Sequence, residues 1–108
     1  DILKFLDRTL SRVDVSGDQI GDRGVEILAE ICKLHGDITT VGLRNSRISE
    51  KGVSHLAEAL TKDQAITDLD ISYNDIGNEG INSLTQMVQH NRVLTRLDLS
   101  RMKEQGNW

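Results

Sequence analysis

The chain has 108 residues, which is enough for one domain, and only 3% of them are aromatic, so aliphatic side chains must fill its interior. The formal charge of −4 without a basic cluster argues against nucleic-acid binding. No apolar stretch approaches the roughly 20 residues that span a bilayer, and no signal-peptide pattern occurs. The single cysteine, Cys32, cannot form an internal disulfide. We therefore expect a cytoplasmic protein that binds neither nucleic acid nor membrane.

The first segments predict a helix end, a strand and a helix, in that order. Residues 1–10 predict the end of a helix with an apolar face made of Ile2, Leu3, Phe5 and Leu6. Alternating apolar residues predict a strand near 12–16, and apolar residues at helical spacing predict a helix near 23–35. The inward positions of this helix are Val25, Leu28 and Ile31, and Cys32 is also expected in the core.

The same order of elements returns at a constant interval of 28 residues. Strands are predicted near 40–44 and 68–72, followed by helices near 51–62 and 79–90. The inward positions of the last helix are Ile81, Leu84, Met87 and Val88. A fourth strand is predicted near 96–100, after which the pattern is lost. A fixed period of this length predicts a solenoid, in which each unit buries its apolar face against its neighbours.

The alternation of strands and helices also predicts how the solenoid is shaped. Successive strands should lie parallel, and the wider helical layer should curve the array, so that strands line the concave face and helices the convex face. Gly24, Gly52 and Gly80 occupy the same place in the first turn of each helix, where a side chain would strike the neighbouring layer. Ser49 is expected to cap the N-terminus of its helix.

The arrangement Ile66-x-x-Leu69-x-Ile71-x-x-Asn74 resembles a leucine-rich repeat, and the long helix after Ile76 resembles the ribonuclease-inhibitor-like subclass. The resemblance implies an α/β leucine-rich repeat solenoid. Its single domain, 1–108, would consist of a partial helix at 1–10, repeats at 11–38, 39–66 and 67–94, and a partial repeat at 95–108. The family's interior ladder position, usually Asn or Cys, falls at Asp18, Ser46, Asn74 and Met102. Asp18 and Ser46 could still bond backbone amides, whereas Met102 could not.

The concave face carries the candidate binding residues. Asp70 and Asp98 should be neighbours on adjacent strands, where like charges repel and a basic group of a partner would relieve them. Gly42 should leave a gap beside them. The predicted partner-binding residues are Arg44, Asn45, Asp70, Tyr73, Asp98 and Arg101. The alternative is an ordinary solvated face on which Arg44, Arg96 and water satisfy the carboxylates.

Catalysis, metal binding and cofactor binding are not expected. Two aspartates on an open surface lack the enclosed pocket that perturbs a pKa. The three histidines, His35, His55 and His90, lie at different positions of their repeats and do not converge as metal ligands. The glycine-rich stretch 21–24 opens a helix and lacks the Lys-Ser/Thr of a phosphate loop.

We therefore expect a non-enzymatic module that binds a protein partner through its concave face and the adjacent loops. The resemblance also permits a GTPase-activating protein that acts through the loops after the strands, at Asn45, Tyr73 or Arg101. A third reading is a structural spacer between other domains. Neither end of the array carries a convincing polar cap, so the chain is expected to be a fragment of a longer protein, with self-association through the uncapped ends as the alternative.

Overall fold

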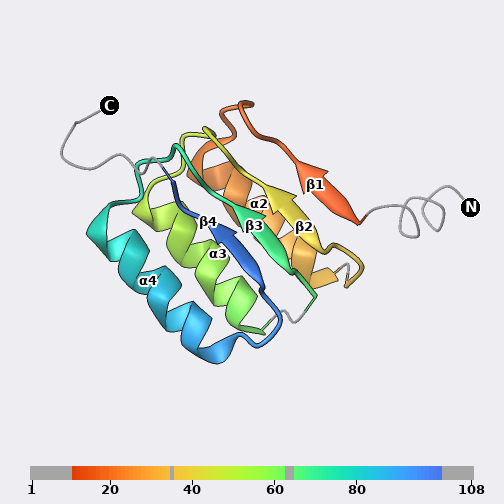
Figure 1. The fold of residues 1–108 in the computed structure, drawn as a ribbon. Helices are drawn as coiled ribbons and strands as arrows, with labels where there is room; N and C mark the ends of the chain where they lie inside the picture. Colours follow the sequence, from red (N-terminus) through yellow and green to blue (C-terminus); the bar gives the residue numbers. More distant parts are fainter. Residues whose placement is uncertain (1–10, 35, 63–64, 101–108) are drawn as a thin grey trace, which may run out of the picture.

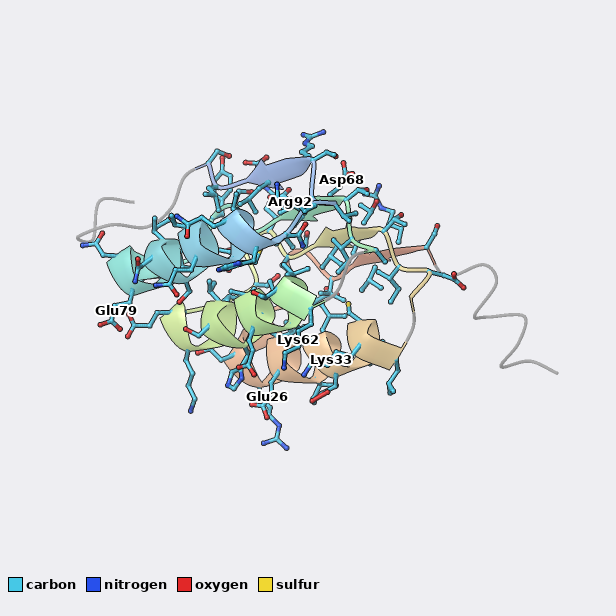
Figure 2. The ribbon with its side chains drawn as sticks, turned by 90° about the horizontal axis from the view of Figure 1, so that it is seen from below. Glu26, Lys33, Lys62, Asp68, Glu79 and Arg92 are labelled. Carbon is cyan, nitrogen blue, oxygen red and sulfur yellow. The ribbon has the colours of Figure 1, made fainter. Side chains whose placement is uncertain are left out.

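The computed structural model describes residues 11–34, 36–62 and 65–100. Its elements in chain order are β1 (Arg12–Asp14), α2 (Gly21–Leu34), β2 (Thr40–Gly42), α3 (Glu50–Lys62), β3 (Asp68–Asp70), α4 (Gly77–His90) and β4 (Arg96–Asp98). The strands form one parallel sheet in the order β1-β2-β3-β4, and the three helices lie side by side behind it (Figure 1). Figure 2 shows the same two layers from below. The predicted α/β repeat architecture is confirmed.

The register of the sheet equals one repeat. Arg12 pairs with Thr40, Thr40 with Asp68, and Asp68 with Arg96, so each residue lies beside the residue 28 positions later. Equivalent positions of successive repeats therefore form straight rows across the sheet. We call the side of the sheet that is turned away from the helices the strand face; it is the face that the sequence predicts to be concave.

The strands end two residues earlier than predicted. After β1, β3 and β4 the sequence reads Asp-x-Ser, and the backbone N–H of the serine donates to the side chain of the aspartate that ends the strand. This local bond satisfies an amide that a continuing strand would otherwise engage, and it turns the chain. β2 ends at the same repeat position without this motif, and the N–H of Arg44 donates there to Oγ of Ser16.

The core lies between the two layers and is aliphatic, as the composition predicts. Its most completely buried side chains include Ile38, Leu43, Ile48, Leu56, Leu60, Ile66, Leu69, Ile71, Ile76 and Leu84. Cys32 belongs to the same cluster. Each repeat contributes the same positions, so the layers of neighbouring repeats interlock.

Two predicted core residues are exposed, whereas others, such as Ile20 and Ile81, are partly buried against the core. Ile31 is 37% exposed and Val88 is 49% exposed. Both lie on the outer helices of the described array, α2 and α4. At the position of Ile31, Ala59 and Met87 are buried by the neighbouring helix, and at the position of Val88, Leu60 is buried in the same way. Among residues 11–34, 36–62 and 65–100, the outer flanks of α2 and α4 have no such neighbour.

The helices begin one or two residues earlier than predicted. Gly21 and Gly77 start α2 and α4 with φ values of +70° and +64°, a left-handed conformation that glycine adopts without steric cost. Ser49 precedes α3, and its hydroxyl accepts a bond from the N–H of Lys51 at 3.3 Å. The predicted capping role of Ser49 is confirmed.

A second cap on α3 comes from the preceding repeat, and the sequence analysis missed it. Oδ1 of Asp22, in the first turn of α2, accepts hydrogen bonds from the backbone N–H groups of Ser49 (2.8 Å) and Gly52 (3.1 Å). Oδ2 of Asp22 accepts a bond from the hydroxyl of Ser49. A carboxylate at a helix N-terminus is favourable because it meets the unsatisfied N–H groups and the positive end of the helix dipole. Asp22 therefore links two repeats.

Two different steric contacts explain why glycine occupies the first helical turn at Gly24, Gly52 and Gly80. At Gly52, the nearest atoms to an added Cβ belong to Asp22 and Ile48, so the neighbouring repeat does crowd this site, as predicted. At Gly24 and Gly80, the nearest atoms belong instead to Ile20 and Ile76 of the same repeat. Contact with the neighbouring layer therefore explains Gly52 but not Gly24, where the helix packs on its own preceding loop.

We expect Gly52→Val to lower the free energy of unfolding by about 1–3 kcal/mol, because the new side chain overlaps Asp22 and breaks its cap on α3. Urea denaturation measures this change. Gly36→Val is the matched control, since no atom lies within 4 Å of a Cβ at Gly36. Equal denaturation midpoints for the two variants would contradict the crowding of Gly52.

Candidate functional site

Carboxylates form a row across the strand face. The register of β3 and β4 pairs Asp70 with Asp98, and hydrogen-bonded strands lie about 4.8 Å apart. Asp14 occupies the same row on β1, and Gly42 lies between it and Asp70. We call Asp14, Asp70 and Asp98 the acidic row. The predicted adjacency of Asp70 and Asp98 is therefore what the sheet register produces.

One oxygen of each carboxylate is already engaged. Oδ1 of Asp70 accepts bonds from the N–H of Ser72 at 3.0 Å and from its hydroxyl at 2.6 Å. Oδ1 of Asp98 accepts the same two bonds from Ser100, at 3.0 and 2.8 Å. Within the described ranges, Oδ2 of Asp70 and Oδ2 of Asp98 accept no hydrogen bond. These two oxygens are available to a basic group from outside.

The arginines of the strand face do not neutralise this pair by direct contact. In the described part of the chain, neither Arg44 nor Arg96 forms an ion pair with Asp70 or Asp98. The ion pair on this face joins Nη2 of Arg12 to Oδ2 of Asp14 at 3.4 Å, with both side chains well exposed. An exposed pair of this kind contributes little to stability.

Local hydrogen bonds stabilise the charged forms of two carboxylates. Bonds from the backbone and hydroxyl of Ser100 hold the pKa of Asp98 below its usual 3.8, and the charges of Arg96 and Arg44 lower it further. Bonds from the hydroxyl and backbone of Ser16 lower the pKa of Asp14 in the same way. Both carboxylates therefore stay ionised at neutral pH, and the acidic row carries negative charge.

These pKa shifts predict an acid-sensitive part of the stability. A lowered folded-state pKa means that the unfolded chain binds more protons, so the stabilisation is complete above pH 3.8 and is lost as the pH falls through the folded-state pKa. In Asp14→Asn with Asp98→Asn, we expect the urea midpoint to fall less between pH 6 and pH 2.5 than in the parent. A drop as large as that of the parent would contradict the lowered pKa values.

The gap predicted at Gly42 is partly filled. A Cβ atom at Gly42 would lie 2.6 Å from Oδ1 of Asp14 and 3.3 Å from Oγ of Ser16, so the Asp14 carboxylate leans over the glycine. A hollow of about 190 Å³ remains in the middle of the strand face, and its lining includes Asp70 and Arg96. The strand face therefore has a shallow acidic depression rather than an open slot at Gly42.

Tyr73 stands at the end of β3 and packs against an arginine. The guanidinium carbon of Arg44 lies 4.4 Å from the centroid of the Tyr73 ring, a cation–π geometry. Arg101, another of the predicted binding residues, lies outside the described residues. The stacking brings two predicted binding residues, Arg44 and Tyr73, together beside the acidic row.

The loops after β2 and β3 form a second hollow, of about 500 Å³. Its lining residues are Asn45, Arg47, Ile48, Ser49, Tyr73, Asn74 and Asp75. Ile48 and Asn74 are 1% and 2% exposed, so they form its floor, whereas Asn45 and Arg47 are exposed. We call this the loop hollow. It contains the predicted residues Asn45 and Tyr73, and it adds Arg47 and Asp75, which sequence reasoning did not select.

Asn74 holds the floor of the loop hollow in place. Its Oδ1 accepts hydrogen bonds from the backbone N–H groups of Ser46 (2.9 Å) and Ile48 (3.0 Å) in the preceding repeat. Its side-chain NH₂ donates to the carbonyls of Leu43, Ile71 and Ser72, at 2.8, 2.9 and 3.1 Å. One buried amide therefore ties two successive loops together.

The other predicted ladder positions behave differently. The hydroxyl of Ser46 lies within donating distance of two carbonyls, those of Val15 (3.3 Å) and Arg44 (3.2 Å), instead of accepting from amides as predicted. A hydroxyl has one hydrogen to donate and is too short to bridge two amides as an asparagine does. Asp18 is exposed, and Met102 lies outside the described residues.

The remaining candidates for chemistry are separate in space. Within the described ranges, no three His, Cys, Asp or Glu side chains gather as a metal-binding group. Cys32 is 3% exposed, in the core. Nε2 of His55 lies 3.8 Å from Oε2 of Glu26 on the helix layer, and His35 lies outside the described residues. No described helix has the length and apolar character of a membrane span.

Comparisons with known proteins agree with this architecture. Residues 63–84 match a family model described as a leucine-rich repeat. No curated protein sequence is significantly similar to the chain. The solved structure "Leiomodin-1 Actin-Binding Site 2 (ABS2)" is similar in fold, with 20% identity and a TM-score of 0.79. The match covers 93% of this chain and 62% of that one, so the chain spans less than two thirds of the similar structure. The 28-residue period, the parallel sheet backed by helices and the family match together identify the chain as a leucine-rich repeat segment of the ribonuclease-inhibitor-like type.

Proposed function

We propose that this segment binds a protein partner through its strand face and the loops that follow the strands. The observation that carries the proposal is the pair of neighbouring carboxylates, Asp70 and Asp98, whose Oδ2 atoms have no donor within the described residues. A Lys or Arg of the partner that reaches both would form charge-assisted hydrogen bonds and would remove the repulsion between them.

The backbone at Tyr73 supports a binding role for this side chain. The equivalent positions of the three repeats, Gly17, Asn45 and Tyr73, have φ values of +81°, +51° and +61°. Glycine and asparagine adopt this left-handed conformation readily, whereas a bulky residue does so at a cost. A tyrosine at a position that suits glycine is best explained by what its ring contacts, and tyrosine is enriched at the centres of protein interfaces.

The surface around Tyr73 combines apolar area with charge. The Arg44 guanidinium stacks on its ring, and Asn45 offers an exposed amide at the rim of the loop hollow. We therefore place the centre of the contact over Arg44, Asn45, Asp70, Tyr73 and Asp98, with Arg101 as the sixth residue of the proposed set. An extended surface of this kind suits a macromolecule, so the proposed role is non-enzymatic and needs no cofactor. The proposed location is the cytoplasm, because the single cysteine, Cys32, cannot form an internal disulfide.

Actin is the first partner to test, because the structure of similar fold is titled as an actin-binding site. The acidic row would attract a basic side chain on the surface of actin, so this partner can be tested through the salt dependence of binding. We expect labelled chain to bind purified actin monomers and the binding to weaken as salt rises. Absence of binding at low salt would remove actin as the partner without removing the proposed surface.

Photo-crosslinking tests the surface itself. A benzophenone amino acid at Tyr73, in the full chain, should cross-link to the partner, whereas the same group at Gln86 on the helix layer should not. A GTP hydrolysis assay on any GTPase recovered separates a simple binder from a GTPase-activating protein. Cross-linking from Gln86 alone would place the interface on the helices and would refute the proposal.

A further inference from the structure

The loop hollow combines a buried floor with a polar rim. Its volume of about 500 Å³ falls within the roughly 300–1,000 Å³ that is usual for ligand pockets. Ile48 belongs to the floor, and the half-buried Tyr73 also lines the hollow. Arg47 and Asp75 are exposed at the rim and carry opposite charges. The rim therefore favours neither an anion nor a cation.

The polar groups of the floor are already satisfied. Oδ1 of Asn74 accepts two hydrogen bonds and its NH₂ group donates to three carbonyls, which uses both lone pairs and both hydrogens of the amide. The backbone N–H groups of Asn45 and Tyr73 donate to carbonyls of the next repeat. A polar side chain that entered would lose its bonds to water without replacing them at these groups. An apolar side chain would lose none.

The helix N-terminus beside the hollow is engaged as well. Ser49 lines the hollow and immediately precedes α3. Its N–H and that of Gly52 donate to Asp22, and the N–H of Lys51 donates to the Ser49 hydroxyl. N–H groups at a helix start are the ones that would otherwise bind a phosphate or a carboxylate. The chemistry of the hollow therefore suits a large apolar group.

The Tyr73 ring distinguishes this junction from the preceding one. One repeat earlier, the equivalent of Tyr73 is Asn45, which carries no ring. The guanidinium of Arg44 stacks on the Tyr73 ring at 4.4 Å and holds it at the hollow. An aromatic side chain thus lines the hollow three positions along the chain from Asp70 of the acidic row.

The loop hollow and the acidic row are close enough for one segment of a partner to reach both. Three residues of extended chain span at most about 10 Å. The hollow lies between the second and third repeats, whereas Asp70 and Asp98 lie on the third and fourth strands, about one strand spacing of 4.8 Å to the side. An extended segment of about four residues covers this distance.

We propose that the loop hollow receives a large apolar side chain from the same partner segment whose basic side chain binds Asp70 and Asp98. The partner would present these two side chains about four residues apart in an extended segment. The apolar side chain would be the buried anchor, and the polar rim would exclude water around it. This inference rests on the proposed function for the basic contact, and the hollow is tested separately from it.

Three short peptides, added to the full chain, separate the two contacts. They are Ac-Arg-Gly-Gly-Gly-Phe-NH₂, a version with Ala in place of Phe, and a version with Gly in place of Arg. An NMR titration follows the Ile48 methyl groups for the hollow. It follows the N–H groups of Ser72 and Ser100 for the acidic row, because they bond to Asp70 and Asp98. We expect the Arg and Phe peptide to shift both sets and to bind about tenfold more tightly than either other version.

Tyr73→Gly removes the ring at a position whose φ of +61° suits glycine, so the variant should fold. We expect it to abolish the advantage of Phe over Ala and to keep the advantage of Arg over Gly. Asn45→Gly is the matched control, because it makes the same exchange one repeat earlier, at a φ of +51°. It should leave both advantages within about twofold.

Two results would overturn the apolar anchor. One is Ile48 methyl resonances that stay in place at millimolar peptide, and the other is an advantage of Phe that survives Tyr73→Gly. Either result stands even if the amides of Ser72 and Ser100 shift, so it leaves the basic contact intact. Shifts at Ile48 without shifts at Ser72 and Ser100 would support the hollow and contradict the basic contact of the proposed function.

Discussion

Asn74→Leu is expected to lower the free energy of unfolding by at least about 3 kcal/mol, which is a large part of the stability of a small domain. The change deprives the buried N–H groups of Ser46 and Ile48 of their acceptor. It also removes one donor from the carbonyls of Leu43, Ile71 and Ser72, of which Ser72 keeps the N–H of Asn45. Leucine has a similar volume, so lost hydrogen bonds and not a cavity would cause the loss. Urea denaturation measures it.

Asn82→Leu is the control for this experiment, because Asn82 is exposed on α4. We expect it to change the denaturation midpoint little. Hydrogen exchange adds a local test, since the amides of Ser46 and Ile48 should lose protection in Asn74→Leu while those of α4 keep theirs. A midpoint equal to that of Asn82→Leu would mean that Asn74 does not tie the loops together.

Leu56→Ala should lower the free energy of unfolding by about 2–5 kcal/mol, as a truncation in a well-packed core. Leu56 is 1% exposed on α3, the middle helix, which packs against both α2 and α4. Because a solenoid is coupled through nearest neighbours, the loss should also loosen the two adjacent repeats. Calorimetry or urea denaturation gives the global change, and hydrogen exchange across α2 and α4 gives its spread.

Ser54→Ala on the same helix controls for substitution by alanine as such, because Ser54 is exposed. We expect its midpoint to stay near that of the parent. If Leu56→Ala also kept the parent midpoint, the inward face assigned to α3 would be wrong.

The fold could be predicted from the sequence because one pattern is repeated at a constant interval. Val13, Val41, Leu69 and Leu97 fall on the same sheet row only if the strands pair parallel and in register, and the structure pairs them in this way. The constant 28-residue interval therefore predicts the parallel order and the register of the strands. The ends of the array could not be predicted equally well, because the burial of Ile31 and Val88 depends on neighbouring helices and not on their own spacing.

Polar contacts between repeats were harder to predict than the apolar pattern. Asp22 caps the N-terminus of the next helix, α3. From the sequence, an aspartate in the first turn of α2 is explained equally well by a favourable interaction with the dipole of its own helix. The backbone N–H groups of Thr39, Thr67 and Thr95 donate to the carbonyls of Ser11, Thr39 and Thr67, and the hydroxyls of Thr39 and Thr95 donate to the same carbonyls, which forms a ladder at the start of the strands. This ladder has the same 28-residue interval as the core and was detectable in the sequence.

Within the candidate site, adjacency was predictable and side-chain direction was not. The 28-residue interval alone predicts that Asp70 lies beside Asp98, and the register of β3 and β4 pairs them. The inclination of Asp14 over Gly42 and the stacking of Arg44 on Tyr73 depend on rotamers, which a repeat pattern does not contain. The same holds for the Asp-x-Ser turns, which engage Oδ1 and leave Oδ2 for an external group.

The most direct test of the binding surface is a paired charge reversal. Asp70→Lys with Asp98→Lys is compared with Glu58→Lys with Gln86→Lys, which makes two changes on the helix layer. The affinity of each for the partner captured through Tyr73 is measured at one salt concentration, and denaturation midpoints are recorded to verify folding. We expect the strand-face pair to weaken binding about a hundredfold and the helix-layer pair to leave it within about twofold. Binding that survives the strand-face pair and is lost with the helix-layer pair would contradict the account.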